Sequence, residues 1–229
     1  MNLLTKLFLV LTVAALGYAA YEGLVVAPTE QTMGDVQRIF YYHVPSAWTA
    51  FLLFFSNFIA SIVYLAKRNA AADAVAAATA EVGVVFCTVV LVTGPIWARP
   101  VWGIWWTWDA RLTTTLVLWL IYVSYLVLRR YSVGSQTSVL AAALAIFGFV
   151  DVPIVYMTIR WFRTQHPSPV IGGGEGSGLH PSMWPPLLWN WLAFSMLAVV
   201  LVVARYRLQT MEQEVEKEHA HAALQGSPQ

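Results

Sequence analysis

The sequence predicts an all-α integral membrane protein with six transmembrane helices and both termini in the cytoplasm. Three observations support this fold class: 59% of the 229 residues are hydrophobic, only 11% are charged, and six separate runs are apolar enough to cross a bilayer. A soluble globular domain carries about 25% charged residues, so a soluble protein of this composition would expose large apolar patches. The net charge of +1 excludes a strongly basic protein that binds nucleic acid.

The six runs follow one another along the chain. A spanning helix needs about 20 mostly apolar residues. The first run could also be a cleaved signal peptide, but it is long and lacks an A-x-A site before a polar start, so we interpret it as a retained helix. We expect residues 1–208 to form one membrane domain and residues 209–229 to form a polar cytoplasmic tail. The predicted spans lie near residues 7–27, 46–66, 77–97, 112–128, 137–158 and 187–204.

Positive charges near the ends of these runs predict the orientation of the protein. Loops rich in Lys and Arg stay in the cytoplasm, so the side with more of these residues is the inner side. This places both termini inside and the segments 28–45, 98–111 and 159–186 outside. The inner group is Lys6, Lys67, Arg68, Arg129, Arg130, Arg205 and Arg207, and the outer group is Arg38, Arg99, Arg111, Arg160 and Arg163.

Three carboxylates, Glu22, Glu81 and Asp151, lie within the predicted spans or near their ends. An ionisable residue in a span is a functional group, such as a proton relay, or a polar contact between helices. The sequence leaves both interpretations open. Pro153 predicts a kink in the fifth span, because proline removes one backbone hydrogen bond. The single cysteine, Cys87, excludes an internal disulfide and a CxxCH haem-attachment motif.

The middle outer segment contains WGIWWTWDARLT at residues 102–113, where four tryptophans precede Asp109. If this stretch were helical, Trp102, Trp105, Trp106 and Asp109 would share one face. Tryptophan is enriched at membrane interfaces, but an interfacial belt accounts for only one or two such residues at each helix end. A binding surface for a flat apolar ligand is the alternative, and it accounts better for the concentration of indole rings.

Histidines occur in the two other outer segments. His43 lies in YYHVPSAW, His166 in RWFRTQHPSP and His180 in GLHPSMWPP. A single histidine at a helix end is often an interfacial hydrogen-bonding residue. Two imidazoles beside an aromatic surface could instead bind haem iron as axial ligands. Arginines on the same side could bind the haem propionates, and the candidates are Arg38, Arg99, Arg111 and Arg163.

WGIWWTWDARLT is similar to the WWD signature of the haem-handling proteins of cytochrome c maturation, WGxWWxWDxRLT, at every specified position. This family includes the longer CcmF and CcsA-type proteins, and the chain resembles the CcmC type from YYHVPSAW to the sixth span. The resemblance implies that a tryptophan-rich loop, residues 98–113, faces the periplasm. It also implies that His43 and His166 are the axial ligands of haem iron, with His180 as the competing choice for the second ligand.

The resemblance implies haem delivery rather than an enzyme, although the protein could assist the covalent attachment of haem to a partner. The ligand would be haem b, held at the outer face of the bacterial cytoplasmic (inner) membrane. The implied partners are the haem chaperone CcmE, the small protein CcmD, the ABC-transporter pair CcmAB and membrane lipid. A haem lyase subunit of the CcsA type and a polytopic small-solute transporter are the alternative functions. The implied haem-binding residues are Trp102, Trp105, Trp106, Trp108, Asp109 and Arg111.

Overall fold

The computed structural model describes residues 2–132, 134, 136–169 and 178–225. These residues are mostly helical and contain no β-strand. A π-helical turn (Glu22–Val26) extends the first helix, and 3-10 turns precede the second helix (Asp35–Ile39) and the last (Pro181–Met183). The α-helices are α1 (Leu3–Tyr21), α2 (Phe40–Lys67), α3 (Ala70–Trp102), α4 (Ala110–Tyr131), α5 (Thr137–Phe149), α6 (Asp151–Trp161) and α7 (Trp184–Gln225).

Among the described residues, six helical segments are long and apolar enough to cross a membrane, which confirms the predicted all-α fold with six spanning helices. The cytoplasmic location of both termini stays a prediction. Helices α5 and α6 together form the fifth segment and are separated at Val150. The break supports the predicted kink: Pro153 lies in the first turn of α6, where its missing N–H would have no helical partner in any case. The protein is therefore a multi-pass membrane protein.

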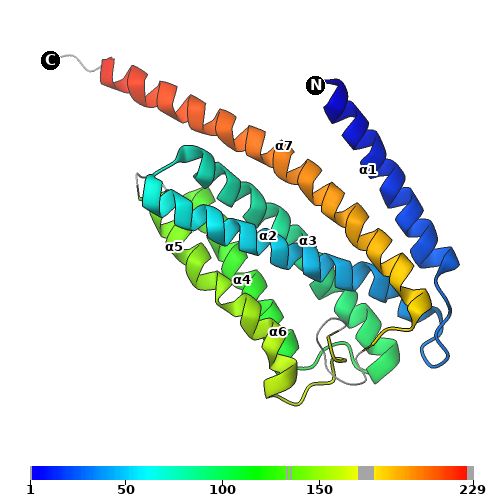
Figure 1. Ribbon diagram of the computed structural model, residues 1–229. Coiled ribbons are helices and arrows are strands. Elements are labelled where there is room, and N and C mark those ends of the chain that lie inside the picture. The colour runs from blue at the N-terminus through cyan, green and yellow to red at the C-terminus, as the bar shows by residue number, and fades with distance from the viewer. Residues whose placement is uncertain (1, 133, 135, 170–177, 226–229) are drawn as a thin grey trace.

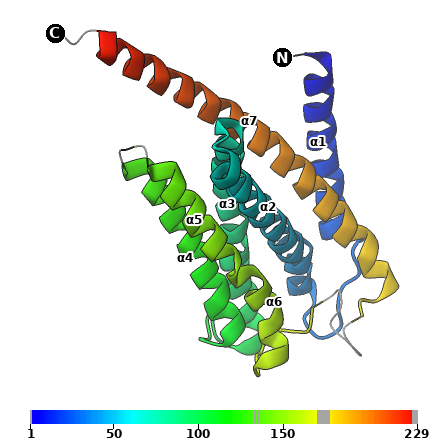
Figure 2. The ribbon, with the colours of Figure 1, turned by 60° about the vertical axis from the view of Figure 1, so that its left-hand side comes forward.

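Successive spanning segments alternate in direction, and α5 and α6 run in the same direction as parts of one segment (Figure 1). Helix α3 packs against α2, α4 and α7, and α1 packs against α7. Figure 2 shows α4, α5 and α6 together on one side of the bundle and α1 and α7 on the other. Helix α1 begins and α7 ends at the same end of the bundle (Figures 1 and 2). We call the opposite end, where residues 27–34, 103–109 and 162–169 lie, the pocket end.

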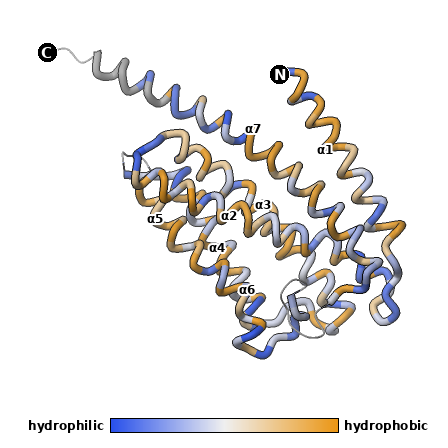
Figure 3. The backbone as a smooth tube through the Cα atoms, viewed as in Figure 1, coloured by the Kyte–Doolittle hydropathy of each residue, from blue (hydrophilic) through white to orange (hydrophobic). Residues whose placement is uncertain are grey.

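Hydropathy changes along α7. Apolar residues cover most of the bundle and the first half of α7, whereas hydrophilic residues gather at the turns and along the stretch of α7 beyond its middle (Figure 3). The helix runs without a break across residue 208 and ends at Gln225. The division of the chain into a membrane domain and a polar tail at that residue therefore stays a prediction based on composition.

Two of the three carboxylates singled out from the sequence have polar partners in the bundle. Glu22 accepts a 2.6 Å hydrogen bond from the hydroxyl of Tyr18, one turn earlier. Glu81 of α3 forms an ion pair with Arg205 of α7. For Glu81 this favours the interpretation as a contact between helices. Asp151 differs, because its buried Oδ2 atom has no hydrogen-bond partner among the described residues.

Small residues let α2 and α3 approach closely at the centre of the bundle. The first half of α3 is rich in alanine and includes Gly83, which faces the buried ring of Phe54. In a membrane the hydrophobic effect does not drive helices together, because lipid is as apolar as the side chains. Small side chains at helix contacts therefore promote association by allowing close van der Waals packing. Phe54 in turn stacks on Tyr122 of α4, with ring centroids 3.8 Å apart. This contact joins α2, α3 and α4 at the centre of the bundle.

Replacing Gly83 with alanine is expected to lower the thermal stability of the solubilised protein. An added Cβ atom would lie 2.6 Å from Cε1 of Phe54. That ring is fully buried and stacked on Tyr122, so it cannot easily move aside. Overpacking typically costs about 1–3 kcal/mol, which outweighs the helix-propensity gain of about 1 kcal/mol from glycine to alanine. Thermal unfolding in detergent measures the difference.

Gly17→Ala in α1 is the matched control for this substitution. No atom lies within 4 Å of the position that its Cβ would occupy, so only the gain in helix propensity applies. The control protein should be as stable as the parent or slightly more stable. Equal melting temperatures for Gly83→Ala and Gly17→Ala would contradict the proposed close packing.

Candidate functional site

A cavity of about 300 Å³ opens at the pocket end of the bundle. Its walls come from α2, α3, α4 and α6 and from the segments 103–109 and 162–169. Most of the lining is apolar and aromatic, with a few polar groups directed into it, as is typical of small-molecule sites. The pocket therefore lies where segments that are far apart in the sequence meet.

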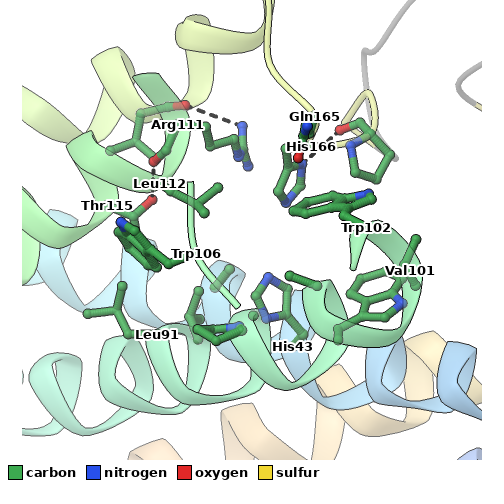
Figure 4. A pocket seen from close by; sticks show the side chains of 18 of the residues that line it. His43, Leu91, Val101, Trp102, Trp106, Arg111, Leu112, Thr115, Gln165 and His166 are labelled. Carbon is green, nitrogen blue, oxygen red and sulfur yellow. Dashed lines mark hydrogen bonds between the residues drawn. The ribbon is translucent and has the colours of Figure 1, made fainter. Parts of the chain in front are cut away.

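Two histidines enter this pocket from opposite walls (Figure 4). His43 comes from the first turn of α2 and is 8% exposed, whereas His166 comes from the segment that follows α6. Their ring centroids are 6.4 Å apart. The imidazole of His43 also meets the indole of Trp97 edge to face, with centroids 6.0 Å apart. Packing of α2 against α3 thus fixes one histidine, and the chain after α6 brings the other to face it.

Each of the two histidines has its Nδ1 atom close to an oxygen. Nδ1 of His43 lies 2.8 Å from Oγ1 of Thr93, and Nδ1 of His166 lies 2.9 Å from the carbonyl oxygen of Pro167. A carbonyl can only accept, so Nδ1 of His166 donates. Hydrogen bonding at Nδ1 leaves Nε2 available in both rings, which is the arrangement commonly found in histidines that bind metals.

His166 is uncharged at neutral pH. Burial lowers the pKa of its imidazole to about 4, and the nearby guanidinium of Arg111 acts in the same direction. The hydrogen bond to Pro167 and the carboxylate of Asp109 oppose this shift without cancelling it. The ring therefore keeps a lone pair, which is the form that binds a metal ion.

Asp109 connects the tryptophan-rich loop to the segment that carries His166. Its Oδ1 atom accepts a 3.0 Å hydrogen bond from the N–H of Leu112, so Asp109 is the N-cap of α4. Its Oδ2 atom accepts a 2.8 Å hydrogen bond from the hydroxyl of Thr164. The same hydroxyl accepts a 3.1 Å hydrogen bond from the backbone N–H of His166. One carboxylate therefore anchors both the start of α4 and the histidine segment.

The tryptophan-rich stretch is not a helix, so the face predicted for it on that assumption is wrong. Helix α3 ends at Trp102, and Gly103 follows with a φ of 79°, which favours glycine and stops the helix. Trp102 and Trp106 line the pocket. Trp105 and Trp108 lie outside the lining and are 59% and 75% exposed. The turn thus divides the four indole rings between the pocket and the surface.

Arg111 is the arginine that lines the pocket, and Figure 4 shows it beside His166. Its Nη1 atom donates to the carbonyl oxygen of Val155 at 3.2 Å, and no carboxylate within the described part of the chain pairs with it. The indole N–H groups of Trp97 and Trp106 are buried and have no hydrogen-bond partner among the described residues. Arg111 is therefore the group at the pocket wall that offers a positive charge to an acidic ligand.

The other arginines considered from the sequence do not line the pocket. Arg38 pairs with Asp35 at 3.0 Å, and Arg99 donates to the carbonyl oxygen of Gly103. Arg163 is exposed. His180 is exposed as well and contacts the hydroxyl of Ser182 at 2.7 Å, outside the pocket.

Three pocket features were missed by sequence reasoning. Met33 and Trp97 line the cavity, and Thr93 contacts His43 from behind. Trp97 belongs to the cluster of tryptophans near the outer end of the third span, which was a usable signal. Met33 and Thr93 carry no local signal, because only the packing of helices distant in sequence places them here.

The fold and this site define a multi-pass membrane protein with an aromatic, histidine-containing ligand pocket at one end of its bundle. The family model described as heme exporter protein C matches residues 1–221. The chain belongs to this family.

Individual relatives agree with the family assignment. The chain is 36% identical over 206 residues to heme exporter protein C of Bradyrhizobium diazoefficiens, covering 89% of this chain and 78% of that protein. It is 34% identical over 225 residues to heme exporter protein C of Haemophilus influenzae, covering 97% and 91%. A putative cytochrome c biosynthesis ccmC-like mitochondrial protein of Arabidopsis thaliana is 35% identical over 190 residues, covering 83% and 72%.

Proposed function

We propose that this protein binds haem b in the pocket, with His43 and His166 as axial ligands, and hands it to an acceptor protein during the maturation of c-type cytochromes. The arrangement of the two histidines carries the proposal. With metal–nitrogen distances of about 2 Å, two imidazoles on opposite sides of one metal have ring centres about 6 Å apart, and the observed separation is 6.4 Å. The names of its relatives, heme exporter protein C, support the same cargo.

The remaining polar groups of the pocket suit the two propionates of haem. Arg111 offers a guanidinium, which binds carboxylates strongly and with fixed geometry. Trp102 and Trp106 offer aromatic surface for the porphyrin. The contacts of haem with Trp105 and Trp108, and a direct contact with Asp109, stay predictions.

We propose the following cellular setting from the resemblance of the WWD motif. The protein lies in the bacterial cytoplasmic membrane with the pocket end on the periplasmic side. The acceptor of haem is the chaperone CcmE, and CcmD and the CcmAB pair complete the assembly. Delivery needs no reacting side chain in this chain, because positioning the vinyl edge of haem for the acceptor is enough.

The absorption spectrum of the protein purified from haem-sufficient cells tests the proposed ligand. We expect a sharp Soret band and split bands in the reduced state, as two imidazole ligands produce. Adding purified CcmE should move haem to that protein. A preparation that stays free of haem under all conditions, including titration with haemin, would contradict the proposal. Covalent attachment of haem to a CxxCH peptide by this chain alone would favour the lyase alternative.

Breaking the link between Asp109 and the His166 segment is expected to weaken haem binding. Thr164→Val removes the hydroxyl that joins the two. Loss of such a supporting hydrogen bond typically lowers metal affinity about 10–100-fold, and we expect a decrease near 10-fold because the histidine itself remains. Asp109→Ala should add a loss of about 1 kcal/mol in stability, since it also removes the cap of α4. Haemin titration and thermal unfolding separate these effects.

Thr114→Val is the matched control, because the Thr114 hydroxyl donates at 2.8 Å to Ala110 of its own helix and does not contact the His166 segment. Haem affinity of this variant should equal that of the parent. If Thr164→Val also binds haem with parental affinity, the proposed role of the link is wrong.

A further inference from the structure

A threonine behind the pocket contacts one of the two proposed ligands. Oγ1 of Thr93 lies 2.7 Å from the carbonyl oxygen of Val89, 3.4 Å from that of Val90 and 2.8 Å from Nδ1 of His43. Thr93 itself does not line the pocket. Any effect of Thr93 on a ligand in the pocket must therefore be transmitted through His43.

The hydrogen atoms at this contact can be assigned by counting donors. A hydroxyl has one proton to donate, whereas a carbonyl oxygen can only accept. The short contact with Val89 is therefore the donated bond, in the manner usual for threonine within a helix. The remaining contact at 2.8 Å must then be a bond from Nδ1–H of His43 to the threonine oxygen. This places the ring proton on Nδ1 and the lone pair on Nε2.

No other hydrogen bond orients the ring of His43 within the described part of the chain. The side chain is 8% exposed, and the aromatic rings of Trp97 and His166 lie next to it. A Cβ atom at Gly94, the residue after Thr93, would lie 3.4 Å from Cε1 of this ring. Thr93 thus provides the one hydrogen-bond acceptor for the imidazole, and Gly94 leaves space for the ring because it has no Cβ atom.

We propose that Thr93 is a positioning residue that holds His43 in the Nδ1–H tautomer, with Nε2 directed to the haem iron. This inference rests on the proposed function and adds a residue that the WWD motif does not contain. A hydrogen bond from Nδ1–H to an oxygen makes the imidazole a stronger donor to the metal. Stronger donation stabilises ferric haem, so the same bond sets the reduction potential of the site.

Two substitutions at one position test this role. Thr93→Val keeps the shape of the side chain and removes the hydroxyl, whereas Thr93→Ser keeps the hydroxyl. We expect Thr93→Val to lower haem affinity about 10–100-fold and to make the reduction potential more positive, while Thr93→Ser stays close to the parent. Haemin titration and spectroelectrochemistry measure the two quantities.

Thr114→Val is the matched control. Thr114 lies outside the pocket lining, donates at 2.8 Å to the carbonyl oxygen of Ala110 and contacts neither histidine through its hydroxyl. This variant should keep the parental reduction potential. An equal shift in Thr114→Val and Thr93→Val would show a general effect of removing a threonine hydroxyl and would overturn the proposal.

The ring nitrogens of the haem-free protein give a readout that does not depend on haem. In protein labelled with ¹⁵N-histidine, the signals that disappear in His43→Ala belong to His43. We expect them to show a protonated Nδ1, and we expect Thr93→Val to change them. A protonated Nε2 in the parent would overturn this inference even if haem binds. A protonated Nδ1 in a protein that never binds haem would instead refute the proposed function and leave the role of Thr93 in place.

Discussion

Replacing His43 and His166 together with alanine is expected to abolish the low-spin haem spectrum of the purified protein. The two rings lie in the same pocket with centroids 6.4 Å apart, and hydrogen bonding at Nδ1 leaves Nε2 of each ring available. Loss of a supporting hydrogen bond alone costs about 10–100-fold in metal affinity, so loss of both ligands should lower haem affinity by more than about 100-fold. The haem content of the preparation and its Soret band measure the effect.

The single variants His43→Ala and His166→Ala show how much each ligand contributes to haem binding. Each should retain some haem with one imidazole, and its spectrum should change from low-spin to high-spin. Added imidazole should restore the low-spin spectrum in a variant that is folded, because the deleted ring leaves space for it. This rescue separates loss of a ligand from loss of the fold.

His180→Ala is the control for the choice of the second ligand. His180 is exposed and contacts Ser182 rather than the pocket. Its removal should leave the spectrum unchanged. If the double variant of His43 and His166 keeps a low-spin bis-imidazole spectrum, or if His180→Ala loses it, the proposed ligand pair is wrong.

The fold class could be predicted from the sequence because it depends on composition over long windows. Runs of about 20 apolar residues have few alternatives to a membrane helix. Helix ends were predicted less well, since they depend on capping and on helix propensity beyond the apolar run. Helix α3 begins at Ala70, capped by Asn69, well before the apolar run predicted near 77–97. Likewise α7 continues to Gln225 through charged residues that favour helix.

The motif residues of the site could be named from the sequence, but their arrangement could not. Periodicity places Trp105 and Trp106 on one face only if the helix continues, and Gly103 ends it. The sequence favoured His166 over His180 as the partner of His43 only through the family resemblance, since both histidines lie beyond α6 in the chain. In the structure, the hydrogen bond from Thr164 to Asp109 distinguishes His166 from His180, because it holds the His166 segment close to the tryptophan-rich loop.

A buried ion pair lies at the end of the bundle opposite the pocket, and leaving either partner without the other is expected to destabilise the fold strongly. Arg129 of α4 donates from Nη1 and Nη2 to the two carboxylate oxygens of Asp73 in α3, at 2.7 and 2.8 Å. The two side chains are 14% and 7% exposed. Ser138 of α5 and Gln213 of α7 each donate to Oδ2 of Asp73 at 3.2 Å. Four helices therefore meet at one carboxylate.

Removing one partner of this pair should lower the stability of the folded protein much more than removing both. Asp73→Ala leaves a buried guanidinium without its counter-charge, which typically costs about 3–5 kcal/mol. We expect Asp73→Ala and Arg129→Met each to lower the melting temperature strongly and to cause aggregation in detergent. The double variant Asp73→Leu/Arg129→Met should recover much of the loss, because apolar residues of similar volume often replace a buried pair without cost. Size-exclusion chromatography after heating measures all three.

Arg130→Met is the matched control, since Arg130 is the next residue of α4 and is exposed. Its removal should change the melting temperature little, as exposed charges contribute little to stability. Because the pair lies at the other end of the bundle from the pocket, the fraction of each variant that remains folded should keep the parental haem spectrum. Equal stability of Arg129→Met and Arg130→Met would show that the pair does not hold the helices together. A changed spectrum in folded Arg129→Met protein would instead show that the two ends of the bundle are coupled.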